Sequence, residues 1–379
     1  MRFAHLSDLH IGKRVNGFSM IEDQKYILNQ VVEIIKREEV EAVILAGDIY
    51  DKTIPSAEAV QILDDFLIQL SNLNLPIFVI SGNHDSAERL SFGARVLRKS
   101  QIYISELYNG EITPITLEDE YGKIHVYLMP FLKPALVRQA LGREEIVTYQ
   151  DAVEMAIHQI PLKEEDRNIL VAHQFVIGAS KSDSEEVSVG GLDQISHTLF
   201  ESFDYTALGH IHGPQHIGKE TIRYCGTPLK YSFSEEAHTK SVTIIDLEQK
   251  GKTTIRMVPL IPMRDMRKIR GKYEEIISQA LADNRSLEDY IQITLTDEED
   301  VLNGLENLRK IYPNIMRFEY DNKRTREQNE LTNTVVIEQR SELELFEEFY
   351  FLQNNQEISK EQRELLQAII EEEKDVEDY

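Results

Sequence analysis

Side chains able to bind metal ions are gathered in five short motifs within the first 212 residues. Aspartate and asparagine offer oxygen ligands and histidine offers an imidazole nitrogen, a mixed set that suits manganese, iron or zinc. Two such cations held close together lower the pKa of a bound water and clamp a phosphoryl group for in-line attack. The residue types therefore predict metal-dependent hydrolysis of a phosphoester. The motifs are Asp8-Leu9-His10, Gly47-Asp48, Gly82-Asn83-His84-Asp85, His173 and Gly209-His210-Ile211-His212.

The spacing within these motifs lets their side chains converge. In Asp-x-His and His-x-His, alternate residues of an extended segment point to the same side. Asp48 is the natural candidate for a carboxylate that bridges two cations. His84 is not needed as a ligand, so we interpret it as the group that donates a proton to the leaving oxygen or stabilises charge on the phosphate. Asp85 is expected to accept the proton on the other ring nitrogen of His84 and to fix its orientation.

Each motif taken alone is weak evidence, because a histidine near a strand end is usually structural or exposed. The five together, in this order and after predicted strands, are a strong indication of metal binding. The lone cysteine, Cys225, is most simply a small core residue. The histidines outside the motifs are interpreted as structural or surface residues: His5, His125, His158, His197, His216 and His238.

Alternating apolar runs and amphipathic stretches predict a layered α/β fold that places the motifs. Helices are expected over 22–38 and 57–70, the second capped by Ser56. The β-α-β-α-β order predicts parallel strands, and ligands bind beyond the carboxyl ends of such strands. The inward face of the second helix is predicted to hold Val60, Leu63, Phe66, Leu67 and Leu70. Strands are predicted at 3–7, 42–46, 77–81, 124–129, 168–172, 205–208, 222–225 and 242–246.

The patterns divide the chain into three parts. Residues 1–262 form the layered domain. Residues 263–337 form a small β-α-β module, with strands at 290–295 and 315–320 around a helix at 298–310. The basic stretch at its entrance is either a solvated linker or a patch that contacts DNA phosphates, and both interpretations stay open. Its members are Arg264, Arg267, Lys268, Arg270 and Lys272.

The third part, 338–379, is predicted to form two short helices at 342–352 and 360–373. Each begins with the pattern of a capping box, Ser341 with Glu344 and Ser359 with Gln362. Helices this short need a cover for their apolar surface, either the chain's own domains or another protein. The candidate partner-binding residues are Phe346, Phe349, Tyr350, Leu365, Leu366 and Ile369.

Composition and charge limit the classes of function. Of the 379 residues 41% are hydrophobic, which is enough for a sizeable core. A formal net charge of -25 argues against binding nucleic acid through the field of the whole chain, so metals, local patches or a partner must supply positive charge. One cysteine and no apolar run long enough for a signal peptide or a membrane span lead us to expect a cytoplasmic location.

The set of motifs resembles that of the calcineurin-like metallophosphoesterases over about the first 215 residues. Longer segments are similar to the SbcD family of nuclease subunits in bacterial double-strand-break repair complexes. They include MRFAHLSDLHIGK, GDIYDKTIPSAEA, GNHDSAERLSFGA, VAHQFVIGASKSDSE, GTPLKYSFSE, MRDMRKIRGKYEE and LFEEFYFLQNNQEISKEQRELL. The resemblance implies a manganese-dependent DNA exonuclease and endonuclease that acts on ends and hairpins in repair, recombination and replication.

The resemblance also implies roles for particular positions. Two divalent cations, expected to be Mn²⁺, would lie beside each other, with His84 acting on the leaving group. One would be held by Asp8, His10, Asp48 and His212, the other by Asp48, Asn83, His173 and His210. Archaeal relatives carry a further active-site histidine three residues after the bridging aspartate, where this chain has Asp51.

The same resemblance implies partners. The module at 263–337 would cap the site and contact DNA, and the two C-terminal helices would bind the coiled coil of an SbcC-type ATPase. The chain would be a homodimer within a heterotetramer, joined through helices at about 57–70 and 88–98, and would lie in the nucleoid. Two other interpretations remain: a small-molecule phosphatase or phosphodiesterase, and a non-enzymatic scaffold for the ATPase. The first would need no partner helices, and the second would be expected to have lost ligands.

Overall fold

The computed structural model describes residues 1–185, 193–282, 286–323, 325–326, 346–347, 350, 358–360 and 362–363. The chain divides into two compact units, Met1–Thr294 with Leu302–Glu319, and Leu295–Val301 with Tyr320–Tyr379. The domain boundaries expected after residues 262 and 337 remain predictions. Within the described residues, no helix is long and apolar enough to cross a membrane.

Two six-stranded sheets form the centre of the first unit. In the first sheet, β1, β4, β5 and β6 are mutually parallel, and β15 runs antiparallel to β1, so the predicted parallel β-α-β-α-β order is confirmed. The strand order is β16 (Thr253–Pro259), β15 (Ser241–Leu247), β1 (Arg2–Leu6), β4 (Ala42–Ala46), β5 (Ile77–Ile80) and β6 (Ile102–Ile104).

The second sheet also has four parallel strands, but here an antiparallel strand lies at each edge. Its order is β13 (Gln215–Ile217), β14 (Lys219–Tyr224), β12 (Tyr205–Gly209), β9 (Arg167–His173), β8 (Gly122–Leu128) and β7 (Ile115–Asp119). The strands predicted at 124–129, 168–172, 205–208 and 222–225 all belong to it.

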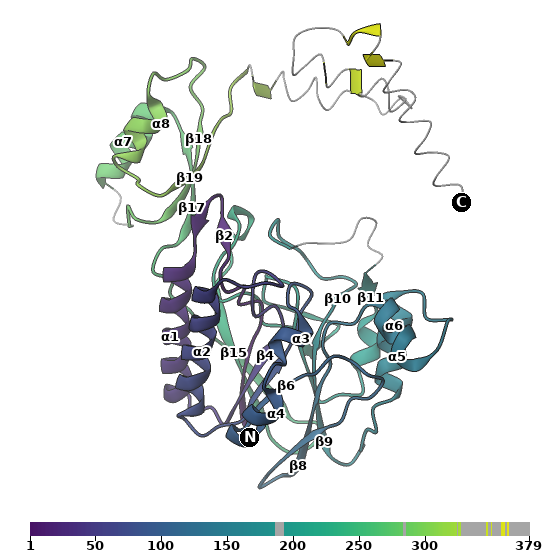
Figure 1. The fold of residues 1–379 in the computed structure, drawn as a ribbon. Helices are drawn as coiled ribbons and strands as arrows, with labels where there is room; N and C mark the ends of the chain where they lie inside the picture. Colours follow the sequence, from purple (N-terminus) through teal and green to yellow (C-terminus); the bar gives the residue numbers. More distant parts are fainter. Residues whose placement is uncertain are drawn as a thin grey trace. The chain divides into compact units, whose positions relative to one another are not determined.

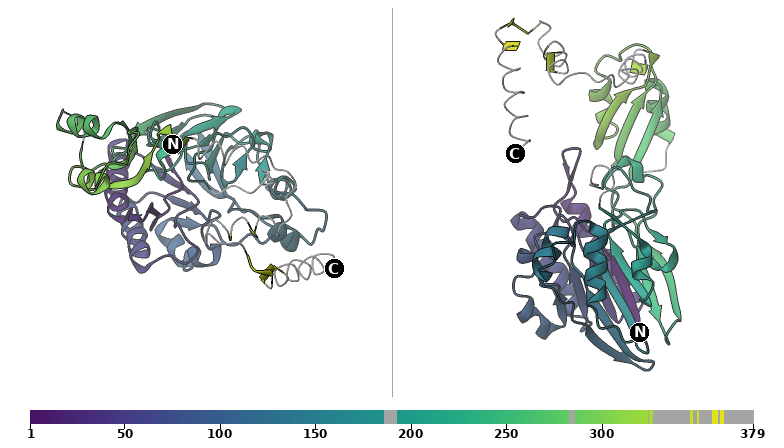
Figure 2. Two further views of the ribbon diagram at one scale, coloured as in Figure 1. Left: turned by 90° about the horizontal axis from the view of Figure 1, so that it is seen from above. Right: turned by 90° about the vertical axis from the view of Figure 1, so that its right-hand side faces the viewer.

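The two sheets pack face to face, with helices on their outer sides. Because β4 and its neighbours are covered on both faces, they are continuous apolar runs. The inner faces meet through residues such as Phe3, Ile44, Phe78, Val126 and Val171. Helices α1 (Ile21–Arg37) and α2 (Ala57–Ser71) cover the first sheet, and α5 (Pro134–Leu141) and α6 (Tyr149–His158) cover the second (Figure 1). Two further views show the same layers (Figure 2).

Helix α2 begins as predicted, and Leu63, Phe66 and Leu70 are buried as predicted, but the first turn buries a different residue. The Ser56 hydroxyl accepts a hydrogen bond from the backbone N–H of Ala59 at 3.2 Å, which is the expected N-cap. Val60 is 46% exposed, so its predicted place in the core is wrong. Ile62 is buried instead, because the stripe runs through Ala59, Ile62, Leu63, Phe66 and Leu70.

A three-stranded sheet with two helices forms the smaller module of the first unit. The strand order is β17 (Met266–Gly271), β18 (Tyr290–Leu295) and β19 (Ile315–Tyr320), with α7 (Tyr273–Ala282) and α8 (Gly304–Arg309) beside it (Figure 1). The two predicted strands are confirmed, and the predicted helix is shorter than expected. The sequence pattern predicts neither β17 nor α7, and most of the basic stretch, for which a solvated linker and a phosphate-contacting patch are both open, belongs to β17.

The remaining elements are short connections. They are β2 (Arg14–Val15), β3 (Phe18–Ser19), α3 (Ala87–Leu90), α4 (Ala94–Leu97), η1 (Arg98–Ser100), β10 (Phe175–Val176), β11 (Gln194–Ile195), η3 (His197–Phe200) and η4 (Phe233–Glu235). Near the C-terminus, the backbone N–H of Ser359 donates to Gln362 Oε1 at 3.0 Å, and the N–H of Gln362 donates to Ser359 Oγ at 3.3 Å. This capping box is confirmed, whereas Ser341 and Glu344 lie outside the described residues.

Two histidines interpreted as structural are held inside the fold. His125 lies between the Thr116 hydroxyl and the Asp166 carboxylate, each 2.9 Å away. His5 is fully buried, with Nδ1 2.9 Å from the hydroxyl of Tyr205. Burial, assisted by the charge of Arg223, lowers the pKa of His5 to about 3. The ring therefore stays neutral in the folded chain at pH values where an exposed histidine is charged.

His5 should make the fold sensitive to acid. Its folded pKa lies below the unfolded value, so the unfolded chain binds more protons and stability falls as pH drops below 6.5. Between pH 7.5 and 5.5, the wild type should lose about 1.4 kcal/mol more unfolding free energy than His5→Gln. Urea unfolding at both pH values measures this, with the exposed His158→Gln as control. Parallel losses in wild type and His5→Gln would contradict the assignment.

Candidate metal centre

The predicted ligand motifs meet at one edge of the two sheets. They follow β1, β4, β5 and β12, and His173 is the last residue of β9. The loops are tied to one another, because the N–H of Asp8 donates to the carbonyl of Gly47 and that of His10 donates to the carbonyl of Asp48, both at 2.9 Å. The backbone therefore fixes where the Asp-x-His segment lies relative to Asp48.

Several of these residues adopt a backbone conformation that side chains other than glycine rarely take. The φ angles are 52° at Asp8, 44° at His10, 49° at Asp48 and 105° at His210. Each such residue costs about 1–3 kcal/mol and persists only where the surroundings impose it. Concentration of this strain on the predicted ligands is typical of a functional site.

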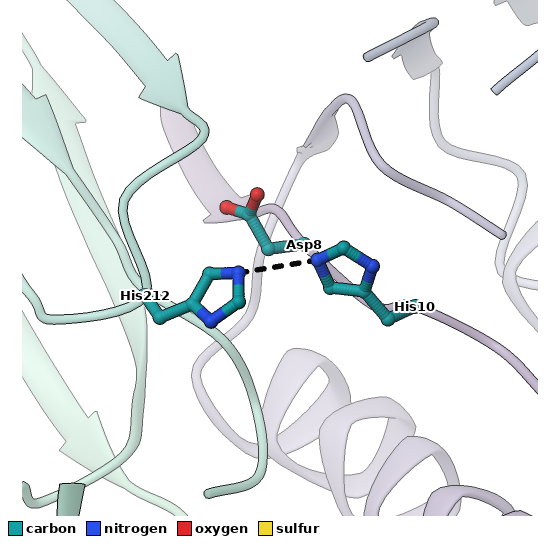
Figure 3. A group of neighbouring side chains, drawn as sticks. All are labelled: Asp8, His10 and His212. Atoms are coloured by element: carbon teal, nitrogen blue, oxygen red, sulfur yellow. Dashed lines mark hydrogen bonds between the residues drawn. The ribbon is translucent and has the colours of Figure 1, made fainter. Parts of the chain in front are cut away.

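One group of ligand atoms comes from Asp8, His10 and His212, whose atoms lie within 4.8 Å of one another (Figure 3). The Nε2 atoms of His10 and His212 face each other at 3.2 Å. Burial lowers the pKa of both histidines well below the ordinary value, so both rings are neutral. Two neutral imidazole nitrogens that face each other can share only one proton, and a cation satisfies both better.

A second group comes from Asn83, His173 and His210. The amide oxygen of Asn83 lies 3.0 Å from Nε2 of His173 and 2.9 Å from Nδ1 of His210. Asp48 lies between the two groups, with Oδ2 3.3 Å from His173 Nε2 and 3.7 Å from His10 Nε2. This is the position that a bridging carboxylate needs, and oxygen with neutral imidazole is a donor set that fits divalent cations.

The charges at the centre are strongly coupled. Burial alone would raise the pKa of Asp48, but His173 and His10 hold it well below its ordinary value. Burial would likewise lower the pKa of His173, yet Asp48 and Asp8 raise it to about 9. Asp8 shows the opposite balance, since burial raises its pKa to about 7. The pocket thus holds oppositely charged side chains next to one another. A bound cation can take the place of the positive charge that histidine supplies there.

His84 faces the same pocket without belonging to either group. Its Nε2 lies 4.0 Å from Asp48 Oδ2, and its backbone N–H donates to Asp48 Oδ1 at 2.9 Å. Its Nδ1 lies 3.1 Å from the carbonyl oxygen of Asp51. His84 is also close enough to His10 and Asp48 to complete a possible ligand trio, but its exposed edge and its carbonyl partner suit a group that meets substrate.

The predicted role of Asp85 is wrong. Its carboxylate accepts hydrogen bonds from the backbone N–H groups of Ile49, Tyr50 and Gly82 at 2.9–3.0 Å, and His84 is oriented by the Asp51 carbonyl instead. The side chain turns back beneath the loops, where three N–H groups would otherwise be buried without partners. Burial, with the nearby charge of Asp48, raises the pKa of Asp85 to about 6 against these hydrogen bonds. Asp85 therefore supports the loops.

Two glycines are required by close approach of the backbone. A Cβ at Gly82 would lie 2.1 Å from Asp48 Oδ1, and a Cβ at Gly209 would lie 1.9 Å from the carbonyl oxygen of Ala46. Any side chain at these positions would push the strand ends apart. The glycines beside the ligands thus allow the two sheets to meet at the site.

The basic stretch 264–272 is only partly available for DNA. Arg264 pairs with Asp23 at 2.8 Å and Glu22 at 3.1 Å, joining the module to α1. Arg267 is only 6% exposed and pairs with Asp289 at 2.7 Å. These arginines fold the module, which contradicts a phosphate contact for Arg267. The exposed members are Lys268, Arg270 and Lys272.

The predicted partner-binding residues are described only in part. Phe346 is exposed and Tyr350 is half-buried, and the structure places each in a short helical segment. Phe349, Leu365, Leu366 and Ile369 lie outside the described residues.

Residues around His212 form a supporting group that the sequence analysis missed. Ser184 and Glu185 contact His212 directly, and Glu235 with Lys240 lies behind them. The segments SKSDSE and YSFSE contain three of them, but the sequence analysis used those segments only for their family resemblance. No periodicity or spacing connects loops so far apart in the chain.

Comparison with known proteins assigns the chain to a family. The family model of the calcineurin-like phosphoesterases matches residues 1–214, over half of the chain, so the chain belongs to that family. The family model of the type 5 capsule protein repressor C-terminal domain matches residues 262–354. The SbcD component of nuclease SbcCD from Staphylococcus epidermidis is 32% identical over 374 residues, covering 98% of each chain. Within the phosphoesterases, the chain is a member of this SbcD family.

Solved structures with similar folds have much lower identity. A dimetal phosphatase from Danio rerio is 11% identical, with a TM-score of 0.41 over 69% of this chain and 96% of that one. A protein of Thermus thermophilus is 13% identical, with a TM-score of 0.38 over 68% of this chain and 98% of that one.

Asp85→Asn should weaken metal binding although Asp85 is no ligand. An amide has one oxygen, so it cannot accept all three N–H groups, and the loop that holds Asp48 should shift. We expect manganese affinity to fall about 10- to 100-fold, the usual effect of losing an outer partner of a metal site. Calorimetric titration measures it. Asp151→Asn is the matched control, a surface carboxylate that also accepts backbone N–H groups; equal affinities in all three proteins would refute the role.

Proposed function

We propose that this chain is the metal-dependent nuclease component of an SbcCD-type complex. It hydrolyses DNA phosphodiester bonds at ends and hairpins and works with an SbcC-type ATPase in repair and recombination. The observation that carries the proposal is the relationship to the SbcD component of nuclease SbcCD over nearly the whole chain, combined with convergence of every predicted ligand in one pocket. A scaffold that had lost activity would not be expected to keep that set.

We propose that the pocket holds two divalent cations, with Mn²⁺ as the metal. Asp48 would bridge them, with Asp8, His10 and His212 on one side and Asn83, His173 and His210 on the other. Cations bound there supply an activated water and neutralise charge on the phosphodiester. This positive charge is what a chain of net charge -25 otherwise lacks for contact with DNA.

His84 is the proton donor in this proposal, and the structure limits how it can act. The carbonyl oxygen of Asp51 can only accept, so the proton on the His84 ring lies on Nδ1. His84 can then donate from Nε2 only as the imidazolium, carrying protons on both nitrogens. In that form it can protonate the leaving oxygen or stabilise charge on the phosphate.

The alternative, a phosphatase for small molecules, is not favoured. The relationship to the nuclease covers the small module and the C-terminal segment as well as the phosphoesterase domain. A small-molecule enzyme has no need of the two latter parts, whereas a nuclease can use them to contact DNA and to bind its ATPase. In the proposal, Lys268 and Arg270 face DNA and the two C-terminal helices predicted from the sequence, at 342–352 and 360–373, bind the ATPase.

A homodimer within a heterotetramer is the proposed assembly, located in the cytoplasm at the nucleoid. Exposed apolar side chains on α2 and on the segment 87–100 support the predicted contact between copies. They are Val60, Ile68, Phe92 and Val96. Covering these exposed apolar side chains with a second chain would lower the free energy of the assembly.

Substitutions at the centre should separate catalysis from metal binding. His84→Gln should bind manganese as the wild type does but cleave DNA about 10²- to 10⁴-fold more slowly, because it loses proton donation. Asp48→Asn should lose both properties. End-labelled duplex and hairpin DNA report cleavage, and elemental analysis reports metal, with exposed His158→Gln as control. Metal loss in His84→Gln would refute its assignment, and cleavage of model phosphoesters but not DNA, even with the ATPase, would favour the alternative.

Phe92→Glu should disrupt the dimer. Phe92 is 87% exposed, and a carboxylate there cannot be buried against a second copy without a large desolvation cost. Self-association should weaken by more than about tenfold in sedimentation velocity. Leu302→Glu is the matched control, since Leu302 is 86% exposed on the small module. Unchanged sedimentation of Phe92→Glu would exclude this surface as the contact.

A further inference from the structure

His212 is held at every polar atom except the one that faces the metal site. Its backbone N–H donates to Glu185 Oε1 at 2.7 Å, and its carbonyl accepts from Lys240 Nζ at 2.9 Å. Its ring Nδ1 lies 2.6 Å from Ser184 Oγ. Among the described residues, Nε2 is left to face only His10.

The partners of Ser184 fix where its proton lies. Ser184 Oγ is also 2.6 Å from Oε1 of Glu235, a fully buried carboxylate that pairs with the ammonium of Lys240. A carboxylate only accepts, so Ser184 gives its single proton to Glu235. Ser182 Oγ, 2.9 Å from Ser184 Oγ, is left to donate to Ser184 or to the Glu185 carboxylate. The Ser184 hydroxyl must therefore accept from His212, which places the ring proton on Nδ1 and the lone pair on Nε2.

We propose that Ser184, Glu235 and Lys240 form a positioning relay that fixes the tautomer of His212 and sets the metal affinity of the Asp8–His10–His212 group. The inference rests on the proposed metal site. A hydroxyl that links an imidazole to a carboxylate makes the free ring nitrogen a stronger electron-pair donor to a metal. Outer hydrogen-bond partners of metal ligands generally have this effect. Lys240 pairs with the buried Glu235 carboxylate and also donates to the His212 carbonyl, so one side chain holds both groups in place.

The other metal group has no comparable support among the described residues. His173 is oriented by the neutral carbonyl of Ala46, at 2.9 Å from Nδ1. The Nε2 of His210 has no hydrogen-bond partner in the described part of the chain. The relay therefore acts on one side of Asp48, and the two cations should bind with different affinities.

The relay also gives a role to two segments that the nuclease function by itself does not require. SKSDSE supplies Ser184, and YSFSE supplies Glu235. The two segments are joined directly, because the backbone N–H of Asp183 donates to Ser234 Oγ at 2.9 Å. The chain that follows β10 is thereby built into the support of a metal ligand.

Manganese titration of the full-length chain tests the relay without DNA. In Ser184→Ala, one of the two binding events should weaken about 10- to 100-fold and the other should stay unchanged. Ser184→Thr keeps the hydroxyl and should restore the wild-type isotherm. Ser278→Ala is the matched control, since it removes an exposed hydroxyl that donates to the Glu274 carbonyl in α7, on another part of the chain.

A double-mutant cycle identifies the affected site. Once His212→Ala has removed the first site, adding Ser184→Ala should change nothing further. Unchanged affinity in Ser184→Ala, an equal loss at both sites, or no recovery in Ser184→Thr would overturn the relay. So would a drop in thermal stability of the metal-free Ser184→Ala that Ser184→Thr shares. A chain that binds two cations with this asymmetry yet never cuts DNA would refute the proposed function and leave the relay standing.

Discussion

The site depends on one carboxylate that stays charged although it is buried. Asp48 is almost fully buried, and a lone charge there would be very unfavourable. Its charge is retained because His173, His10 and His84 surround it. The same arrangement makes the pocket fit cations, since imidazole nitrogens and oxygen atoms lie on both sides of a carboxylate that can be shared. The groups that stabilise the buried charge of Asp48 are therefore the same groups that form the metal site.

The fold meets that constraint through groups that never contact the pocket. Asp85 gathers three backbone N–H groups beneath the loops, the Asp51 carbonyl orients His84, and Ser184 orients His212. Gly82 and Gly209 let the strand ends approach closely enough for the ligands to meet. The left-handed backbone at Asp8, His10 and His210 is held by hydrogen bonds that their own N–H groups donate, to the carbonyls of Gly47 and Asp48 and to the Asp8 carboxylate. Ligands alone, without this support, would not keep their geometry.

Charged residues outside the pocket also limit how the chain can contact DNA. The chain is strongly acidic, and ion pairs occupy arginines that the sequence offers as DNA contacts, as Arg264 and Arg267 show. One of these arginines stabilises the small module and the other joins it to α1. Neither is an exposed arginine of a solvated patch. In the proposed function, positive charge for DNA would come from cations bound at the site and from exposed lysines such as Lys268.

The sequence by itself determined the parallel order of the first strands, the approximate positions of most central strands and the residues that could act as ligands, because apolar periodicity and residue type are local properties. It also determined that Ser56 and Ser359 begin helices, since capping is a contact within one turn. Tertiary structure alone decided that Asp85 turns from His84 to the loop N–H groups, that Val60 is exposed, and that Ser184 meets Glu235. These outcomes depend on which distant segments supply unpaired polar groups or apolar surface, and no spacing along the chain encodes that.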